Sequence, residues 1–299
     1  MNEALVLAQS LTLLTGLKKQ EQLRLFIHIG STAQFCSLKG SDIEALLERP
    51  LQSSQWNAEQ LVDRAHKQLE HYMKRSVNAV PYGDVAYPPL LTELADPPLI
   101  LYYRGVLPDP EQPMVAVVGT RNPTGAGRTQ AYTFGFDLGS KGIAVVSGLA
   151  RGIDSMAHRG NLEGGGKTVA VLGNGLDSVY PVSNRALALR IFQNGGCLIS
   201  EYPPGVPPYK WHFPERNRII AGFARDTIVV EAPEHSGSLI TAQFALDQGR
   251  EVWIGSVCRT SPQGQGGRTL AEDGAIYIDS VQALFNEWNQ VMNETAQEE

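Results

Sequence analysis

Glycine recurs together with serine, threonine or arginine in three loops of this chain, each directly after a short run of apolar and β-branched residues. The loops cover residues 119–121, 147–154 and 231–238. A helix is expected to follow each of them, and the first turn of a helix carries unpaired backbone N–H groups and the positive end of the helix dipole. Loops of this kind bind anions, above all phosphate. In a parallel α/β sheet they emerge along one edge, so they are expected to converge on a single phosphate-bearing ligand.

The residue types within the three loops suit phosphate binding. Glycine lets the backbone approach a ligand closely, arginine makes charge-assisted hydrogen bonds, and serine caps a helix or offers a hydroxyl. Asp154 is expected to cap the helix after the second loop, and His158, one turn later, to make a structural hydrogen bond. The candidate binding residues in these loops are Gly119, Thr120, Arg121, Ser147, Gly148, Arg151, Gly152, Ser236, Gly237 and Ser238.

A fourth segment, residues 211–222, combines aromatic rings with Arg216, Asn217 and Arg218. Aromatic rings stack on bases and guanidinium groups hold phosphates, so this mixture is typical of proteins that bind single-stranded nucleic acid. The alternative is a structural role, with Phe213 buried and the arginines in salt bridges. Both roles are expected to contribute.

Motifs for several kinds of enzyme are absent. The first loop does not fit the Gly-x-Gly-x-x-Gly pattern, and the Gly-Gly-Gly-Lys-Thr stretch at 164–168 runs into a strand where a P-loop needs a helix. No Gly-x-Ser-x-Gly elbow is present, and Glu201, Glu231 and Glu234 are weak candidates for a general base. The three cysteines have no metal-like spacing. We therefore predict no catalytic residue, no metal and no cofactor.

Charge is distributed unevenly along the 299 residues, whose net charge is −6. Residues 115–221 hold 11 basic and 6 acidic side chains, whereas residues 222–299 hold 4 and 12. A local basic excess around the glycine loops indicates a polyanion-binding surface better than the total charge does. No segment is apolar enough to span a membrane and no signal peptide is recognisable, so we expect a cytoplasmic protein without membrane contact.

The order of predicted elements indicates an α/β fold. Residues 1–80 have helical periodicity and are predicted to form a small helical domain of the SAM or helix-hairpin kind. Residues 81–290 are predicted to form an extended Rossmann-like, doubly wound and mostly parallel sheet, followed by an acidic tail over 291–299. The strands are predicted at 99–103, 115–118, 143–146, 168–172, 197–200, 227–230, 251–254 and 276–278.

Several long motifs in a fixed order resemble the DprA/Smf family of DNA-processing proteins. They are Val-Gly-Thr-Arg at 118–121, Ser-Gly-Leu-Ala-Arg-Gly-Ile-Asp at 147–154, Ser-Glu-Tyr-Pro at 200–203, Phe-Pro-Glu-Arg-Asn-Arg-Ile-Ile-Ala-Gly at 213–222 and Ser-Gly-Ser-Leu at 236–239. The resemblance runs from about residue 86 to residue 280. Two positions at one corner of the expected pocket depart from the family pattern, Arg268 in place of asparagine and Ile254 in place of proline.

The resemblance implies a homodimeric protein without catalytic activity that binds and protects single-stranded DNA and loads the RecA recombinase during natural transformation. It places the DNA pocket at the residues of the first two loops and at Arg216, Asn217 and Arg218. Two alternatives remain open, a phosphoribohydrolase of the LOG type acting on nucleoside monophosphates and a nucleotide sensor. The hydrolase family carries a catalytic glutamate that the stretch ending at Ile240 and Thr241 lacks.

Overall fold

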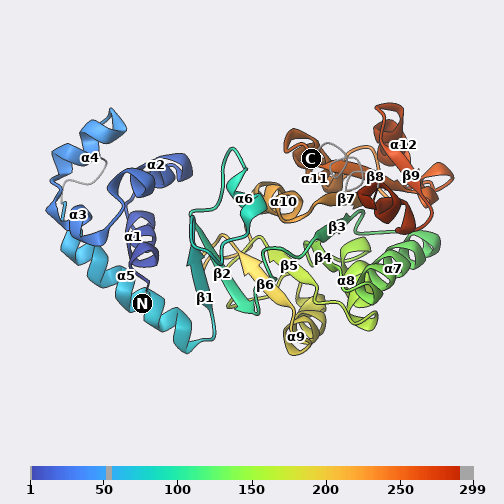
Figure 1. Ribbon diagram of the computed structural model, residues 1–299, viewed down its shortest axis with the longest axis horizontal. Helices are drawn as coiled ribbons and strands as arrows, with labels where there is room; N and C mark the ends of the chain where they lie inside the picture. Colours follow the sequence, from blue (N-terminus) through green and yellow to red (C-terminus); the bar gives the residue numbers. More distant parts are fainter. Residues whose placement is uncertain (1, 52–55, 290–299) are drawn as a thin grey trace.

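In the computed structural model, which describes residues 2–51 and 56–289, nine strands form one sheet in the order β1-β2-β6-β5-β4-β3-β7-β8-β9 (Figure 1). Every strand predicted from the sequence is present, within two residues at each end. The strands are β1 (Asn78–Pro81), β2 (Ile100–Gly105), β3 (Met114–Val118), β4 (Ala144–Ser147), β5 (Val169–Leu172), β6 (Cys197–Ser200), β7 (Asp226–Val229), β8 (Glu251–Gly255) and β9 (Ile276–Ile278). The unpredicted strand β1 is four residues long and lies at the sheet edge, where its terminal proline is tolerated.

The direction in which the chain crosses the sheet reverses beside β3. Strand β3 pairs in parallel with both β4 and β7. The chain therefore winds outward through β4, β5 and β6 on one side, and then through β7, β8 and β9 on the other. Only β1 and β2 run antiparallel to their neighbours. The loops after β3 and β7 diverge at this switch point, which is where doubly wound sheets hold their ligands.

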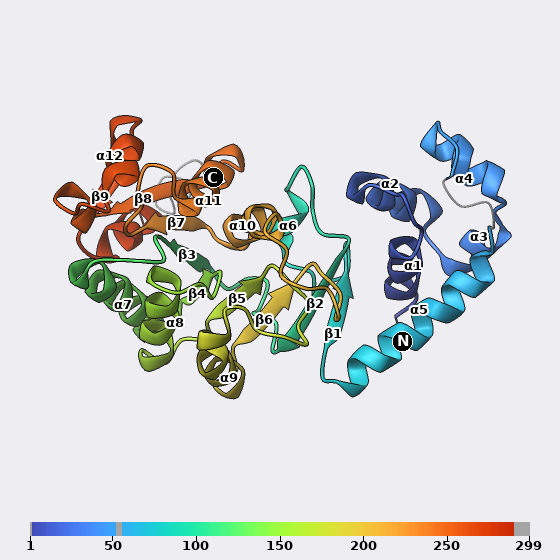
Figure 2. The same cartoon turned by 180° about the vertical axis from the view of Figure 1, so that it is seen from behind.

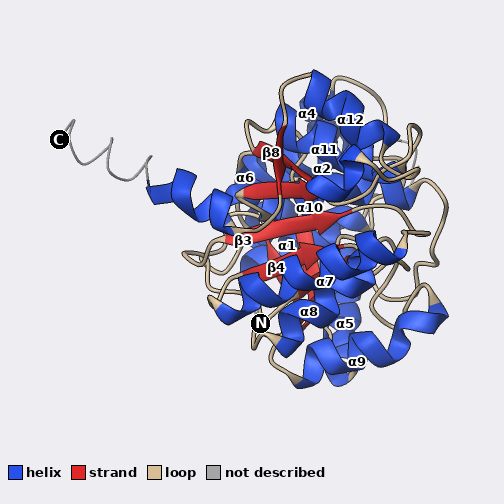
Figure 3. Ribbon diagram, turned by 90° about the vertical axis from the view of Figure 1, so that its right-hand side faces the viewer, coloured by secondary structure: helices blue, strands red, loops and turns tan. Residues whose placement is uncertain are grey.

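Helices cover both faces of the sheet (Figures 2 and 3). On β3, Val115 and Val117 pack with the core beneath α7 and α8, whereas Ala116 and Val118 pack with the core beneath α10 and α11. This unbroken apolar pattern is expected of a strand that is buried on both faces. The helices of this region are α6 (Pro89–Thr92), α7 (Gly125–Ser140), α8 (Ile153–Glu163), α9 (Arg185–Gln193), α10 (His212–Phe223), α11 (Gly237–Asp247) and α12 (Gln265–Glu272), with short 3₁₀ turns η1 (Val182–Asn184) and η2 (Ser256–Arg259).

The N-terminal helices form a module at the β1 end of the sheet (Figure 1). They are α1 (Glu3–Thr12), α2 (Lys19–Ile29), α3 (Thr32–Ser37), α4 (Gly40–Leu47) and α5 (Ala58–Lys74). Their core is continuous with that of the sheet: the buried Tyr102 hydroxyl on β2 donates to Gln9 Oε1 at 2.7 Å, and the Tyr102 ring meets the Tyr72 ring edge to face. The helical character predicted for this part of the chain is confirmed, while the domain boundary near residue 80 stays a prediction.

The predicted acidic tail, residues 291–299, lies outside the described residues. Among the helices that the structure describes, none combines the length and apolar character needed to cross a bilayer.

Candidate nucleic-acid interface

A cavity of about 790 Å³ opens at the carboxyl ends of β3 and β7, at the switch point of the sheet. This volume is in the range of sites that hold small molecules or single nucleotides, about 300–1,000 Å³. Segments far apart in the sequence meet there. The polar and aromatic side chains that line it are Thr120, Arg121, Asp154, Tyr180, Lys210, Phe213, Arg216, Asn217, Glu234, His235, Ser236, Ser238 and Thr241.

The loop after β3 supplies Gly119, Thr120 and Arg121, as predicted. Arg121 is exposed, and its guanidinium carbon lies 5.9 Å from the centre of the Phe213 ring on α10. A cation over an aromatic face in a cavity is placed to hold a phosphate while the ring contacts a base. Thr120 closes the loop, since its backbone N–H donates to the Glu231 carbonyl at 2.7 Å.

The loop after β4 supports the cavity from behind. Ser147 is fully buried, and its hydroxyl donates to the Val117 carbonyl at 2.7 Å. Gly152 has a φ of +82°, and a Cβ at this position would lie 2.4 Å from the Thr120 carbonyl oxygen. Only glycine allows the second loop to approach the first this closely. Arg151 is exposed at the tip of the loop and does not line the cavity.

A buried pair of opposite charges fixes the same loop. The Asp154 carboxylate accepts hydrogen bonds from the backbone N–H groups of Gly148 and Ala150, at 3.1 and 3.3 Å. The Arg216 guanidinium donates to the Gly148 carbonyl at 3.1 Å and to the Val171 carbonyl. Asp154 therefore holds the loop that precedes α8, and the expectation that it caps this helix is wrong.

Burial shifts the titration of both members of this pair. Arg216 is 5% exposed, and burial lowers the pKa of its guanidinium to about 10, with Arg121 nearby adding to the effect. It therefore stays protonated at neutral pH. Burial also raises the pKa of the Asp154 carboxyl, although Arg216 opposes that shift. The cavity floor thus carries a permanent positive charge that is partly balanced by Asp154.

Helix α11 directs its amino end into the cavity. Ser236 caps the helix, because its hydroxyl oxygen accepts from the Ser238 backbone N–H at 3.3 Å. Asn217 on α10 donates from its side-chain amide to the Gly237 carbonyl at 3.0 Å and so ties the two helices together. Ser236, Gly237 and Ser238 all line the cavity, as the sequence predicted.

The amino end of α7, by contrast, is already occupied by a carboxylate of the protein itself. Glu231 is fully buried and accepts from the Thr124 N–H at 2.9 Å, from the Thr124 hydroxyl at 2.7 Å and from the Ser261 hydroxyl. The expectation that each of the three loops offers free N–H groups is therefore wrong for the first loop. It is also wrong for much of the second, where the N–H groups of Gly148 and Ala150 donate to Asp154 and that of Ile153 donates to the Thr120 carbonyl. Glu231 is an internal anion that fixes the amino end of α7, and it does not line the cavity.

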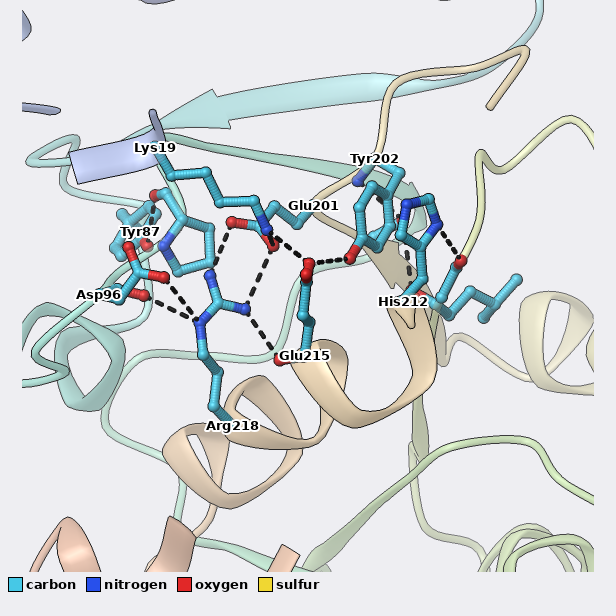
Figure 4. A network of polar contacts seen from close by, with 12 residues as sticks. Lys19, Tyr87, Asp96, Glu201, Tyr202, His212, Glu215 and Arg218 are labelled. Atoms are coloured by element: carbon cyan, nitrogen blue, oxygen red, sulfur yellow. Dashed lines mark hydrogen bonds and ion pairs between the residues drawn. The ribbon is translucent and has the colours of Figure 1, made fainter. Parts of the chain in front are cut away.

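Arg218, also on α10, does not line the cavity. Figure 4 shows its guanidinium within a network of polar contacts with Glu201 and Asp96. Its guanidinium makes a bidentate ion pair with Glu201, at 2.7 and 3.1 Å, and contacts Asp96. Burial opposes ionisation of Glu201, but Arg218 and Lys19 outweigh it and lower the pKa of this carboxyl. Lys19 of α2 joins the network at 2.9 Å from Glu201, so the helical module is attached to the sheet at this point.

Eight of the thirteen predicted binding residues line the cavity, and five do not. Ser147, Gly148 and Gly152 shape it from behind, Arg151 lies beside it, and Arg218 lies elsewhere. Sequence reasoning missed Tyr180, Lys210 and His235. Lys210 precedes the aromatic segment and His235 lies within the third loop, so both could have been included with those motifs, whereas Tyr180 carries no periodic or motif signal.

Three other expectations have clear outcomes. His158 makes a structural hydrogen bond, as predicted: its Nδ1 lies 2.7 Å from the Thr168 hydroxyl oxygen. Arg268 donates to the Cys258 and Ser261 carbonyls, at 2.7 and 3.0 Å. Ile254 is buried in β8. Neither of these two departures from the family pattern lines the cavity.

The chain is a doubly wound α/β protein with arginines in a cavity at the switch point of its sheet, the position at which proteins of this class hold their ligands. The comparison with protein families identifies the particular group. Residues 78–289 match the family model described as DNA recombination-mediator protein A. The chain belongs to this family, which confirms the resemblance seen in its motifs.

Individual relatives agree with this assignment. The DNA processing protein DprA of Bacillus subtilis is 38% identical over 230 residues, which cover 77% of this chain and 77% of the relative. The X-ray structure of DNA processing protein A from Streptococcus pneumoniae matches with a TM-score of 0.75 and 34% identity, over 94% of this chain and 95% of that one. A structure of the Helicobacter pylori protein, described for its single-stranded DNA binding mode, matches with a TM-score of 0.63 and 28% identity, over 71% of this chain and 96% of that one.

Proposed function

We propose that this chain binds single-stranded DNA in the cavity at the switch point and acts without catalysis as a recombination mediator. One observation carries the proposal: two arginines, a lysine and two aromatic rings converge with the amino end of α11 in one cavity of a chain that belongs to this family. The single-stranded DNA described for the Helicobacter pylori relative supports the choice of ligand.

The cavity can hold a nucleotide without reading its sequence. Arg121 and Lys210 are exposed and free to contact backbone phosphates, while the rings of Phe213 and Tyr180, 5.4 Å apart, offer faces to a base. Arg216 adds a fixed positive charge beneath them. Because phosphate contacts and stacking are common to all nucleotides, we expect little base preference.

Duplex DNA fits this site poorly. Its bases are paired and stacked on one another, so they cannot enter the cavity and contact Tyr180 or Phe213 without being unstacked. We also propose that the bound strand is protected in the cytoplasm during transformation, that the chain works as a homodimer, and that it delivers the strand to the RecA recombinase. These finer assignments follow from family membership and the proposed ligand.

Fluorescence anisotropy with labelled oligonucleotides tests the proposal. We expect a single strand to bind tightly, a duplex of the same sequence weakly, and a nucleoside monophosphate to compete poorly. Preference for the duplex would refute the assignment. Tight mononucleotide binding without oligonucleotide binding would support a nucleotide sensor, and release of free base from a nucleoside monophosphate would support the hydrolase.

A further inference from the structure

An exposed pair of stacked aromatic rings lies directly beside the cavity. The rings of Tyr209 and Trp211 are 4.7 Å apart and tilted by 5°. Trp211 is 60% exposed and Tyr209 is 44% exposed. Exposed aromatic rings of this kind offer a face on which a nucleic-acid base can stack. We call the rings of Tyr209 and Trp211 the aromatic platform.

The aromatic platform is held rigidly by buried groups. Both rings meet the edge-on ring of His212, at 5.3 and 5.8 Å. His212 is 7% exposed, stacks on Tyr202 at 3.7 Å, and its Nδ1 lies 3.0 Å from the Gly173 carbonyl oxygen. A platform fixed in this way loses little conformational entropy when a ligand stacks on it.

The aromatic platform is continuous with the cavity through Lys210. This lysine stands between Tyr209 and Trp211 in the chain, and it lines the cavity together with Phe213. A strand whose phosphate is held by Lys210 therefore has an aromatic face within reach for a neighbouring base. Alternating rings and cations along one path are what single-stranded nucleic acid requires.

We propose that the aromatic platform stacks on bases of single-stranded DNA that extends beyond the cavity, so that the binding site is longer than the cavity alone. This inference rests on the proposed function and adds a second part to the same site. Trp211, with the larger exposed ring, makes the main contact, and Lys210 joins the two parts.

Binding to two lengths of oligothymidylate tests the inference: a short strand of one nucleotide with a phosphate at each end, which occupies the cavity alone, and a long strand of about 15 nucleotides, which also reaches the aromatic platform. Trp211→Ala is expected to weaken binding of the long strand about tenfold, the value of one stacked base, and to change binding of the short strand less than about twofold. Trp211→Phe is expected to recover most of the loss, because it keeps a ring.

Phe192→Ala is the matched control. Phe192 is an exposed ring near the end of α9, just before β6 begins, and therefore at the opposite edge of the sheet from the cavity. It is expected to leave both lengths unaffected. Tryptophan fluorescence gives a second measurement: the long strand should quench the wild type more than Trp211→Phe, and the short strand should quench both equally.

The outcomes separate the two claims. A wild type that binds neither length refutes the proposed function. A wild type that binds both, with Trp211→Ala weakening neither or weakening both equally, overturns the aromatic platform and leaves the cavity intact. Loss confined to the long strand, with rescue by Trp211→Phe, supports it.

Discussion

Replacement of Glu201 by glutamine is expected to destabilise the protein strongly, although Glu201 does not line the proposed DNA-binding cavity. The side chains of Glu201 and Arg218 are each 9% exposed, and their two contacts of 2.7 and 3.1 Å make a bidentate pair. Surface ion pairs contribute less than about 1 kcal/mol, whereas breaking a buried pair by removing one partner costs about 3–5 kcal/mol. Because both side chains are this deeply buried, the cost of about 3–5 kcal/mol applies to this pair.

The network around the pair places the expected value at the lower end of that range. Asp96 remains 3.5 Å from Arg218, and the Glu215 carbonyl still accepts from it at 3.1 Å, so the guanidinium keeps some partners in Glu201→Gln. We therefore expect a loss of about 3 kcal/mol in the free energy of unfolding. Urea denaturation followed by circular dichroism measures it.

A double variant provides the control. Glu201→Gln combined with Arg218→Met leaves no unpaired buried charge, so it should be less destabilised than the sum of the two single changes. A loss below about 1 kcal/mol in Glu201→Gln, or strictly additive losses, would refute the assignment of a coupled buried pair.

The same variants decide between two roles for Arg218. The sequence pattern placed this arginine in the DNA pocket, whereas the structure pairs it with Glu201 away from the cavity. We expect folded Arg218→Met to keep the wild-type dependence of DNA affinity on salt. A log–log slope that falls by about 0.7 would show instead that Arg218 neutralises a phosphate.

Three further predictions concern the cavity and the ion pair. Arg121→Ala should weaken binding to every single-stranded sequence and reduce the log–log salt slope by about 0.7, as measured by anisotropy at several salt concentrations. Gly152→Ala should lower the free energy of unfolding by about 1–3 kcal/mol, because its φ of +82° and the 2.4 Å approach of a Cβ to the Thr120 carbonyl strain the backbone. The free energy of unfolding should decrease as the pH is lowered below about 4.5, because the pKa of Glu201 is lowered in the folded protein from its ordinary 4.5. Glu201→Gln should make this decrease smaller.

Each of these has a clear contrary result. An unchanged salt slope in Arg121→Ala would remove this residue from the phosphate site. Wild-type stability and binding in Gly152→Ala would mean that the two loops can move apart freely. An equal fall with acid in the wild type and Glu201→Gln would assign the acid sensitivity to other carboxyl groups.

The sheet was predictable because its strands are marked by local composition. Runs such as Val115–Val118 are apolar on both faces, and the glycine and serine loops that follow them end each strand within the same few residues. Strand β1 was not predicted because four residues ending in proline carry almost no periodic signal. Its pairing with β2 is fixed only by the tertiary fold.

The amino-acid sequence by itself determined the order of strands and helices, the switch-point loops and the residue types that suit phosphate. The tertiary structure decided which side of each element faces the cavity. Arg216 and Arg218 stand two residues apart on α10, and because that spacing places them on different sides of a helix, one lines the cavity while the other pairs with Glu201. Likewise, the Glu231 carboxylate accepts from the Thr124 N–H at the amino end of α7, although the two residues are 107 positions apart in the chain. A buried carboxylate and an unpaired N–H group each need a partner, and only folding brings these two together.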